Sequence, residues 1–291
     1  MQAARGAEGI AAPRVRPRHF SVIPIATYLA MWLIVAGFLL PFFWMVSTSL
    51  KTLSEIGEYP PRWIPNSLEW INYVQVFQDL PFAQFIANSV EISLLFVIGS
   101  VISSSVVAFG FARTRFPGRE FWFILMLSTM MLPFVVTLIP QYVIVFRLHL
   151  LNTYVPLVVP SLFASPFFVF LLRQFMLTIP RDLDEAAQID GCGWWQIYRW
   201  IILPLCKPAL AAVAIFAFVG SWNEFLTPLV YLNQTSLFTV ALGVQLFSGQ
   251  YNSFYNLMMA AALIALLPVI AIFLMAQRYF VEGVVLTGLK M

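Results

Sequence analysis

Six apolar stretches, each long enough to cross a lipid bilayer as a helix, dominate this 291-residue sequence. They cover about residues 23–46, 88–111, 121–141, 154–176, 207–231 and 256–280. A helix needs roughly 20 apolar residues to span the hydrocarbon core, where the backbone must satisfy its own hydrogen bonds. Only 10% of the residues are charged, far below the roughly 25% of soluble domains. The sequence therefore predicts an all-α integral membrane protein with six transmembrane helices.

Basic residues fall unevenly on the two sides of such a bundle. Most lie in residues 1–21, in the loop at 112–120, around residues 180–205 and near the C-terminus. The opposite side carries Lys51, Arg62 and Arg147. By the positive-inside rule, both termini and residues 180–205 are cytoplasmic. Residues 1–21 are then a cytoplasmic basic tail, and residues 22–291 form one six-helix domain.

Residues 180–205, PRDLDEAAQIDGCGWWQIYRWIILPL, mix charged and helix-forming residues between the fourth and fifth apolar runs. Pro180 can stop the preceding helix, and Asp182 is a residue type that caps the start of the next one. Gly191 then ends this first short helix. An apolar stripe at helical spacing follows in a second helix, formed by Trp194, Tyr198, Ile201 and Leu205. The sequence predicts two short helices joined by a turn, with the second at the membrane surface.

The order of residues in this region resembles the cytoplasmic EAA loop of ABC-importer permease subunits. The matching positions are Glu185, Ala186, Ala187, Gly191, Ile201, Leu203 and Pro204. Paired alanines keep the helix thin enough to enter a groove, Glu185 can pair with a basic partner residue, and Gly191 permits a tight turn. The alternative is an ordinary amphipathic hairpin between two spans, although such a hairpin needs neither feature at this spacing.

The resemblance implies a coupling-helix loop between transmembrane helices 4 and 5 that docks onto a separate ATPase subunit. The coupling residues that it implies are Asp182, Glu185, Ala186, Ala187, Asp190 and Gly191. Further segments, WNEFLTPL, MLP with IPQY, and the QRYF ending, are similar to the carbohydrate-uptake branch, the group of the maltose transporter's smaller membrane subunit. The similarity extends from about residue 22 to the end. The tail after Gly283 departs from that group's Gly-Leu-Thr-x-Gly pattern.

Membership of that branch would imply several partners. They are a second homologous permease subunit, two copies of an ABC ATPase subunit, an extracytoplasmic solute-binding protein, a sugar substrate and membrane lipid. The expected location is the cell (inner) membrane of a bacterium or archaeon, in a multi-pass arrangement. ATP and Mg would be bound by the partner ATPase, and no cofactor is expected in this chain.

Polar residues inside the fifth apolar run are the best candidates for a substrate path. Trp222, Asn223 and Glu224 lie together there, and an acid within a membrane span usually faces a polar cavity or a partner. Asn88 and Glu91, at the start of the second run, form a weaker group of the same kind. Glu224 could instead brace two helices or lie near the outer interface.

Two prolines, Pro133 and Pro140, interrupt the third apolar run. Proline frees a backbone carbonyl and bends a helix, which is tolerated where a neighbouring helix or a cavity satisfies the freed group. This pattern favours a helix that lines a pathway, with a static kink as the alternative.

The two longest outer loops differ in character. The first, about residues 47–87, is acidic and rich in proline and tryptophan, and its length predicts one or two short helices. The last, about residues 232–255, is uncharged and corresponds in the resemblance to the loop that reaches toward the binding protein. The positions implied for that contact are Leu246, Phe247, Ser248, Gly249, Gln250, Tyr251, Asn252 and Ser253.

Catalytic and nucleotide-binding motifs are missing from the sequence. It has no phosphate-binding Gly-x-x-x-x-Gly-Lys-Ser/Thr loop, no His-Glu-x-x-His zinc motif and no metal site, and its histidines are His19 and His149. Cys192 and Cys206 are expected to be reduced thiols, and no basic-aromatic patch suggests nucleic-acid binding. We therefore expect a transport subunit that is not itself an enzyme. A permease for a glycerol phosphodiester or a peptide, and a self-contained carrier or membrane enzyme, are the alternatives.

Overall fold

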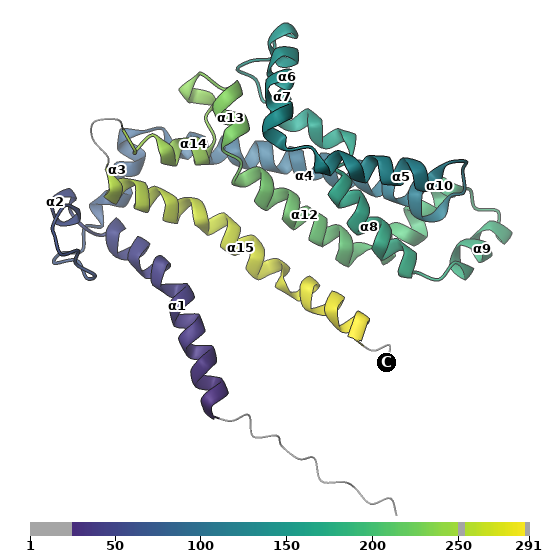
Figure 1. The fold of residues 1–291 in the computed structure, drawn as a ribbon, viewed down its shortest axis with the longest axis horizontal. Helices are drawn as coiled ribbons and strands as arrows, with labels where there is room; N and C mark the ends of the chain where they lie inside the picture. The colour runs from purple at the N-terminus through teal and green to yellow at the C-terminus, as the bar shows by residue number, and fades with distance from the viewer. Residues whose placement is uncertain (1–24, 250–253, 289–291) are drawn as a thin grey trace, which may run out of the picture. The chain divides into compact units, whose positions relative to one another are not determined.

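The structure is a computed structural model that describes residues 25–249 and 254–288, with residues 25–26 and 276–288 described by their backbone alone. The described part is built from helices joined by short connections (Figure 1). In chain order they are α1 (Ile25–Ser49), α2 (Leu53–Ile56), α3 (Ile71–Asp79), α4 (Phe82–Arg113), α5 (Arg119–Ser128), η1 (Thr129–Met131), α6 (Phe134–Arg147), α7 (Val155–Val158), η2 (Val159–Phe163), α8 (Pro166–Thr178), α9 (Asp182–Ile189), α10 (Trp194–Gln196), the π-helix η3 (Ile197–Ile202), α11 (Leu203–Leu205), α12 (Lys207–Trp222), α13 (Leu226–Tyr231), η4 (Thr235–Leu237), α14 (Val240–Gln245) and α15 (Tyr255–Gly288). The predicted all-α fold is confirmed for these residues.

Four helical segments of the described chain are long and apolar enough to cross a membrane. They are Thr27–Ser49, Phe82–Arg113, Val155–Thr178 and Tyr255–Met275. Two further pairs of helices reach this length only together, because Arg119–Met131 and Phe134–Arg147 meet at 95°, and Trp194–Leu205 and Lys207–Trp222 meet at 79°. The described residues thus contain four candidate spans, or six if each bent pair crosses once.

Pro133 lies at the sharper of the two bends. It has no N–H to donate and disfavours helical angles at the residue before it, and Leu132 is accordingly extended with ψ 118°. Pro140, in contrast, lies inside the single helix α6. The two prolines of this run therefore have different effects, since one breaks the helix and the other does not.

The chain divides into two compact units, Met1–Trp44 and Met45–Met291. In the second unit α4 is the central helix, because it packs against α8, α12, α7, η2 and α14 (Figure 1). Small residues allow this close packing: a Cβ at Gly99 would collide with the Ser161 side chain of η2, and the Ser103 hydroxyl donates to the Ser161 carbonyl at 2.8 Å. Close approach through small residues is a general device of helices in membranes.

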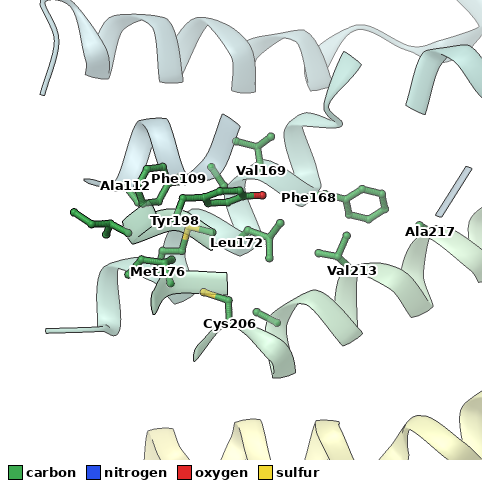
Figure 2. Close-up of a cluster of buried hydrophobic side chains, with 14 of the residues drawn as sticks. Phe109, Ala112, Phe168, Val169, Leu172, Met176, Tyr198, Cys206, Val213 and Ala217 are labelled. Carbon is green, nitrogen blue, oxygen red and sulfur yellow. The ribbon is translucent and has the colours of Figure 1, made fainter. Parts of the chain in front are cut away.

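One apolar cluster fills the space between α4, α8, η3 and α12 (Figure 2). Figure 2 shows Phe109 and Tyr198 facing each other, with their ring centroids 5.2 Å apart. The Tyr198 hydroxyl also shares a hydrogen bond of 2.8 Å with the Ser105 hydroxyl on α4. Cys206, at the start of α12, is fully buried beneath them. This cluster fixes the segment between α9 and α12 to the rest of the bundle.

The loop predicted to be the first outer one contains two short helices, α2 and α3, and an ordered turn around Glu55. Thr52 and Glu55 form a capping box, and Glu55 also accepts the N–H of Asn66 at 2.9 Å. These N–H donors, that of Asn66 first and that of Thr52 next, lower the pKa of Glu55 below its usual value. At neutral pH the ionised carboxylate therefore holds residues 52–66 together.

Candidate functional site

The segment predicted to couple to an ATPase folds as helix α9 with a tight turn at its end. Gly191 has φ +85°, a left-handed angle that costs an L-residue with a Cβ, and its N–H bonds to the Gln188 carbonyl at 3.0 Å. The N–H of Cys192 bonds to the Ala187 carbonyl at 2.9 Å. These two bonds form a Schellman motif, in which a left-handed glycine closes a helix and satisfies its last carbonyls.

The predicted coupling residues lie on two faces of α9. Asp182, Glu185 and Ala186 are exposed, and so are Asp190 and Gly191 just after the helix. Ala187 instead is buried and belongs to the apolar cluster beneath α9. Its small side chain therefore lets α9 pack closely on the chain itself, whereas Ala186 lies on the outward face. The start of the helix differs in detail from the prediction, because Arg181 occupies the cap position and makes no side-chain capping bond.

A buried ion pair, which the sequence did not suggest, attaches α9 to the end of α4. Arg113 bonds through Nη1 to Oδ2 of Asp184 at 3.0 Å, and the two side chains are 1% and 8% exposed. The other terminal nitrogen of Arg113 donates to the carbonyls of Met176 at 2.6 Å and Ile179 at 3.0 Å, at the end of α8. One guanidinium thus joins the ends of α4 and α8 to α9.

Burial raises the pKa of Asp184, and the nearby Arg113 charge offsets this only in part. Oδ1 of Asp184 and Nε of Arg113 have no hydrogen-bond partner among the described residues. The pair therefore gains its stability from one charged contact and two helix-end carbonyls, and it would be disrupted by losing either side chain.

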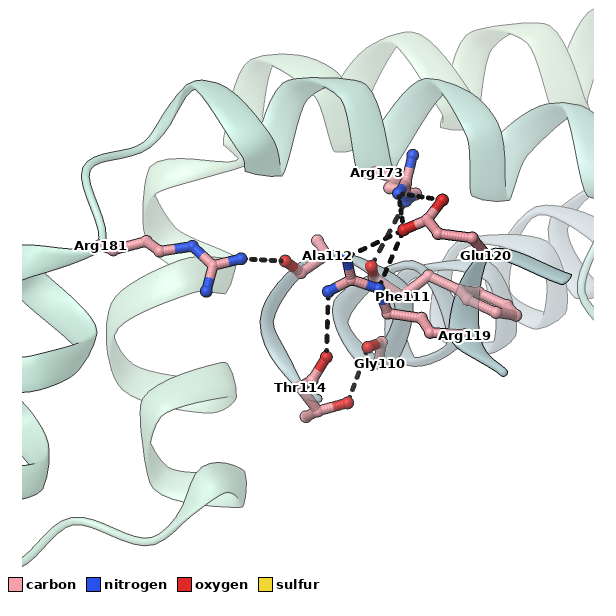
Figure 3. Close-up of polar contacts among 8 residues, drawn as sticks. All are labelled: Gly110, Phe111, Ala112, Thr114, Arg119, Glu120, Arg173 and Arg181. Carbon is pink, nitrogen blue, oxygen red and sulfur yellow. Dashed lines mark hydrogen bonds and ion pairs between the residues drawn. The ribbon is translucent and has the colours of Figure 1, made fainter. Parts of the chain in front are cut away.

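A second arginine makes the reciprocal contact, from α8 to the end of α4 (Figure 3). Arg173 donates through Nε to the Phe111 carbonyl at 3.3 Å and through Nη2 to both oxygens of Glu120 at 3.1 and 3.2 Å. Its guanidinium also lies 4.0 Å from the centroid of the Phe123 ring. Cations at the carboxyl ends of helices interact favourably with the helix dipole. Helices α4 and α8 therefore end side by side, each supplied with an arginine by the other.

A cavity of about 440 Å³ lies at the other candidate site, the predicted substrate path. Residues of α4, α6, α7, η2, α8, α12 and α13 line it, and its wall combines aromatic rings with a few polar groups. The polar lining residues are Gln141, Ser165, Ser221, Glu224, Thr227 and Thr239. The aromatic ones are Phe96, Phe134, Phe168 and Phe216. An apolar wall with a few convergent polar groups is typical of small-molecule sites.

Glu224 both lines this cavity and braces a helix. Its Oε1 accepts the N–H of Thr227 at 2.9 Å and the Thr227 hydroxyl at 3.0 Å, so the carboxylate holds the first turn of α13. The helix that the sequence suggested as one run to residue 231 is interrupted here, since α12 ends at Trp222 and α13 begins at Leu226. The break places the side chain of Glu224 in the cavity wall.

The other four residues of the predicted path do not line this cavity. Asn88 is buried and donates to the carbonyls of Ser236 and Phe238, both at 2.9 Å. The indole N–H of Trp222 donates to the Ala265 carbonyl of α15 at 3.0 Å. Glu91 and Asn223 are exposed, and neither lines the cavity. Of the five predicted residues, only Glu224 is part of the cavity wall, while Gln141 and Thr239 are wall residues that the prediction missed.

The predicted binding-protein contact is described only in part. Leu246 is exposed, whereas Phe247 is buried in a cluster with residues of α3, α4 and α15. Ser248 and Gly249 follow in the chain, and residues 250–253 lie outside the described residues. The buried Phe247 anchors the loop, which leaves Leu246 as the large exposed side chain among these described positions.

Comparison with known proteins identifies the family. A family model described as "Binding-protein-dependent transport system inner membrane component" matches residues 100–285, which include α9, both buried arginines and Glu224. The chain belongs to this family. It is therefore a membrane permease subunit of a transport system.

Curated relatives of this permease are transport subunits of similar length. It is 34% identical over 269 residues to the arabinooligosaccharides transport system permease protein AraQ of Halalkalibacterium halodurans, covering 89% of this chain and 96% of the relative. It is 37% identical over 218 residues to the sn-glycerol-3-phosphate transport system permease protein UgpE of Salmonella typhi, covering 74% and 77%.

The fold of the permease is also known from a solved structure. A chain of a bacterial ABC transporter involved in the import of the acidic polysaccharide alginate superposes with a TM-score of 0.77 at 21% identity. The superposition covers 88% of this chain and 95% of that one. The permease thus has the fold of an ABC-transporter membrane subunit.

Within the described part of the permease, no three His, Cys, Asp or Glu side chains gather where they could hold a metal ion. Its free thiols, Cys192 and Cys206, are half-buried and buried respectively.

Proposed function

We propose that this permease forms half of the path of an importer for a neutral sugar or oligosaccharide. A second, homologous permease subunit would form the other half, and an extracytoplasmic binding protein would deliver the solute. Two copies of a separate ATPase subunit, which bind ATP and Mg, would drive the cycle. In this arrangement both termini and α9 are cytoplasmic, as the basic residues of the sequence indicate.

The observation that carries the proposal is the two-sided environment of α9. Its inner face is fixed to the ends of α4 and α8 through Arg113 and Asp184, while Glu185 and Ala186 face outward. A helix that is anchored on one side and exposed on the other can transmit a displacement from a partner to the bundle. Because α4 and α8 both contribute to the cavity wall, such a displacement reaches the candidate path directly.

The composition of the cavity favours a neutral solute over a phosphate ester. Glu224 is its charged lining residue, and no lysine, arginine or histidine is among the described residues that line it. A phosphate group needs positive charge or N–H donors, whereas sugar hydroxyls suit the carboxylate, amide and hydroxyl groups present. Sugar rings can also lie against the four phenylalanine side chains of the wall. A glycerol phosphate or peptide importer is the second candidate, which the UgpE similarity keeps open.

Uptake measurements in cells that express the complete transport system test this proposal. We expect Glu185→Lys to abolish uptake while the permease remains in the membrane, because it reverses the charge on the outward face of α9. Asp79→Lys is the matched control, since Asp79 is an exposed acid at the end of α3 in the first outer loop. Normal uptake by the Glu185→Lys variant would contradict the coupling role.

The choice of solute is tested with a panel of radiolabelled arabino-oligosaccharide, maltose, sn-glycerol-3-phosphate and dipeptide. We expect a neutral saccharide to be taken up and to stimulate ATP hydrolysis by the purified complex. Uptake of glycerol phosphate alone would exclude the sugar assignment, and transport by the purified single chain without nucleotide would refute the proposal as a whole.

A further inference from the structure

A basic hollow of about 620 Å³ lies where the loop after α4 meets the start of α5. Its lining includes Arg115, Arg119, Arg181, Glu120, Phe116 and Phe121. It is distinct from the cavity of about 440 Å³ that contains Glu224, with which it shares no lining residue. Neither the coupling role of α9 nor the transport path requires three guanidinium groups at this position.

The acid in this hollow is already neutralised. Glu120 accepts from Arg119 at 2.8 Å and from Arg173 at 3.1 Å. Arg115 is exposed and its side chain makes no hydrogen bond or ion pair with any described residue, while Arg181 makes one long bond, of 3.4 Å, to the Ala112 carbonyl. Figure 3 shows Arg181 and Arg119 on either side of the end of α4. Two guanidinium groups therefore retain most of their donors for an anion.

The position of the hollow along the helices favours a lipid as the source of that anion. Arg119 is the first residue of the bent pair of helices Arg119–Met131 and Phe134–Arg147, which together have the length of one span, so the hollow lies at the polar end of an apolar helix. Phe116, Phe121 and Trp122 are exposed beside it. Aromatic side chains next to arginines at the end of a span are typical of the headgroup region of a bilayer.

We propose that this hollow binds the phosphate of an anionic phospholipid, with Arg115 and Arg181 as its main donors. The proposal rests on the proposed orientation, which places the hollow at the cytoplasmic leaflet, where anionic lipids attract basic residues. Arg115 and Arg181 also line the neighbouring hollow, whose acids are Asp184 and Glu185. Asp184 is bound by Arg113 and interacts with Arg181 only through its charge, so the two arginines keep most of their hydrogen-bond donors for the phosphate. The glycerol and acyl chains of the lipid would lie along the exposed rings of Phe121 and Trp122.

Native mass spectrometry of the detergent-solubilised complex of permease and ATPase subunits, with phosphatidylglycerol or phosphatidylcholine of identical acyl chains, tests the site. We expect phosphatidylglycerol to be retained at least fivefold better than phosphatidylcholine. Arg115→Gln should lower this retention about fivefold, and the Arg115→Gln, Arg181→Gln double variant about 25-fold. Arg147→Gln, at the exposed far end of α6, is the control and should bind as the wild type does.

Four outcomes would overturn the proposal. The first is equal retention of the two lipids, and the second is retention that does not change in the arginine variants. The third is displacement of the lipid by inorganic phosphate at equal concentration. The fourth is an Arg115→Gln variant that loses its ATPase subunit but still retains the lipid. The third outcome would indicate a site for free phosphate, and the fourth a protein interface. Lipid binding does not depend on the transported solute, so the uptake panel can fail while the lipid site stands, and the reverse also holds.

Discussion

The buried pair of Arg113 and Asp184 allows a prediction of unequal effects. Arg113→Leu leaves a buried carboxylate without its partner, which typically costs about 3–5 kcal/mol. It also removes the donor of two carbonyls at the end of α8, at about 1 kcal/mol each. Asp184→Asn keeps an oxygen that can accept from Arg113, and we expect it to cost about 1–2 kcal/mol.

These costs translate into clearly separated melting temperatures. The two variants then differ by about 3–6 kcal/mol. With about 2–4 °C per kcal/mol for chains of this order of size, Arg113→Leu should melt roughly 6–24 °C below Asp184→Asn. The fully buried Cys206 is a built-in reporter, because its thiol becomes accessible only when the cluster around it opens. The assay heats the detergent-solubilised chain with a thiol-reactive dye in a Cys192→Ser background. Arg62→Leu, at an exposed arginine, should stay within about 0.5 kcal/mol of the wild type.

The pH dependence of the same pair has a definite sign. Burial raises the folded-state pKa of Asp184 above its ordinary value of 3.8, so the folded chain holds this proton more tightly than the unfolded chain does. The stability that the folded chain gains from the protonated Asp184 is fully present below pH 3.8, and it is lost as the pH rises through the folded-state pKa. The stability of the wild type relative to Asp184→Asn should therefore fall as the pH rises from 3.8 through the folded-state pKa of Asp184. A rising difference, or equal melting of Arg113→Leu and Arg62→Leu, would refute the reasoning.

Three further predictions use the same chain. Gly191→Ala should lower stability by about 1–2 kcal/mol, because a residue with a Cβ is strained at this left-handed backbone angle. Gly193→Ala, at φ −76°, is the control and should be nearly neutral. Equal melting temperatures of the two variants in the dye assay would contradict this prediction. Because the pKa of Glu55 is lower in the folded chain than its ordinary value of 4.5, its ionised carboxylate stabilises the fold above pH 4.5. This stabilisation is lost as the pH falls through the folded-state pKa. Amide hydrogen exchange, corrected for intrinsic rates, should therefore show residues 52–66 losing protection on acidification in the wild type but not in Glu55→Gln, and an unchanged wild type would argue against it. Gly243→Ala places a Cβ inside contact distance of a phenylalanine ring of α4, and it should lower stability by about 1–3 kcal/mol. A variant that melts at the wild-type temperature would show that α4 and α14 are not so closely packed.

The sequence was informative about α9 because its signals are local. Acidic residues at the start, the paired alanines and the glycine at the end are all read within one short segment. The partner of Asp184 was not predictable, since Arg113 lies 71 residues earlier and nothing in the spacing joins the two. The inward direction of Ala187 also depends on how α9 packs, which its own sequence does not determine.

The cavity shows a similar limit. A polar residue in an apolar run indicates that some partner exists, but it does not say whether the partner is a solute or a backbone carbonyl. Asn88 and Trp222 proved to bind carbonyls of neighbouring segments, whereas Glu224 lines the cavity and braces α13. Gln141 follows Pro140 in the run that the sequence suggested as pathway-lining, and the identity of its neighbours could only come from the folded chain.

The reciprocal arginines at the ends of α4 and α8 have a consequence for how the chain is made. A ribosome completes α4 long before it reaches Arg173, so the newly inserted helix initially has neither its capping donor nor an acceptor for Arg113. We expect this intermediate to be a preferred substrate for membrane chaperones and quality-control proteases until α8 arrives. A chain truncated after residue 150 and released from the ribosome should be degraded faster than one truncated after residue 190. Equal lifetimes would show that the two helices mature independently.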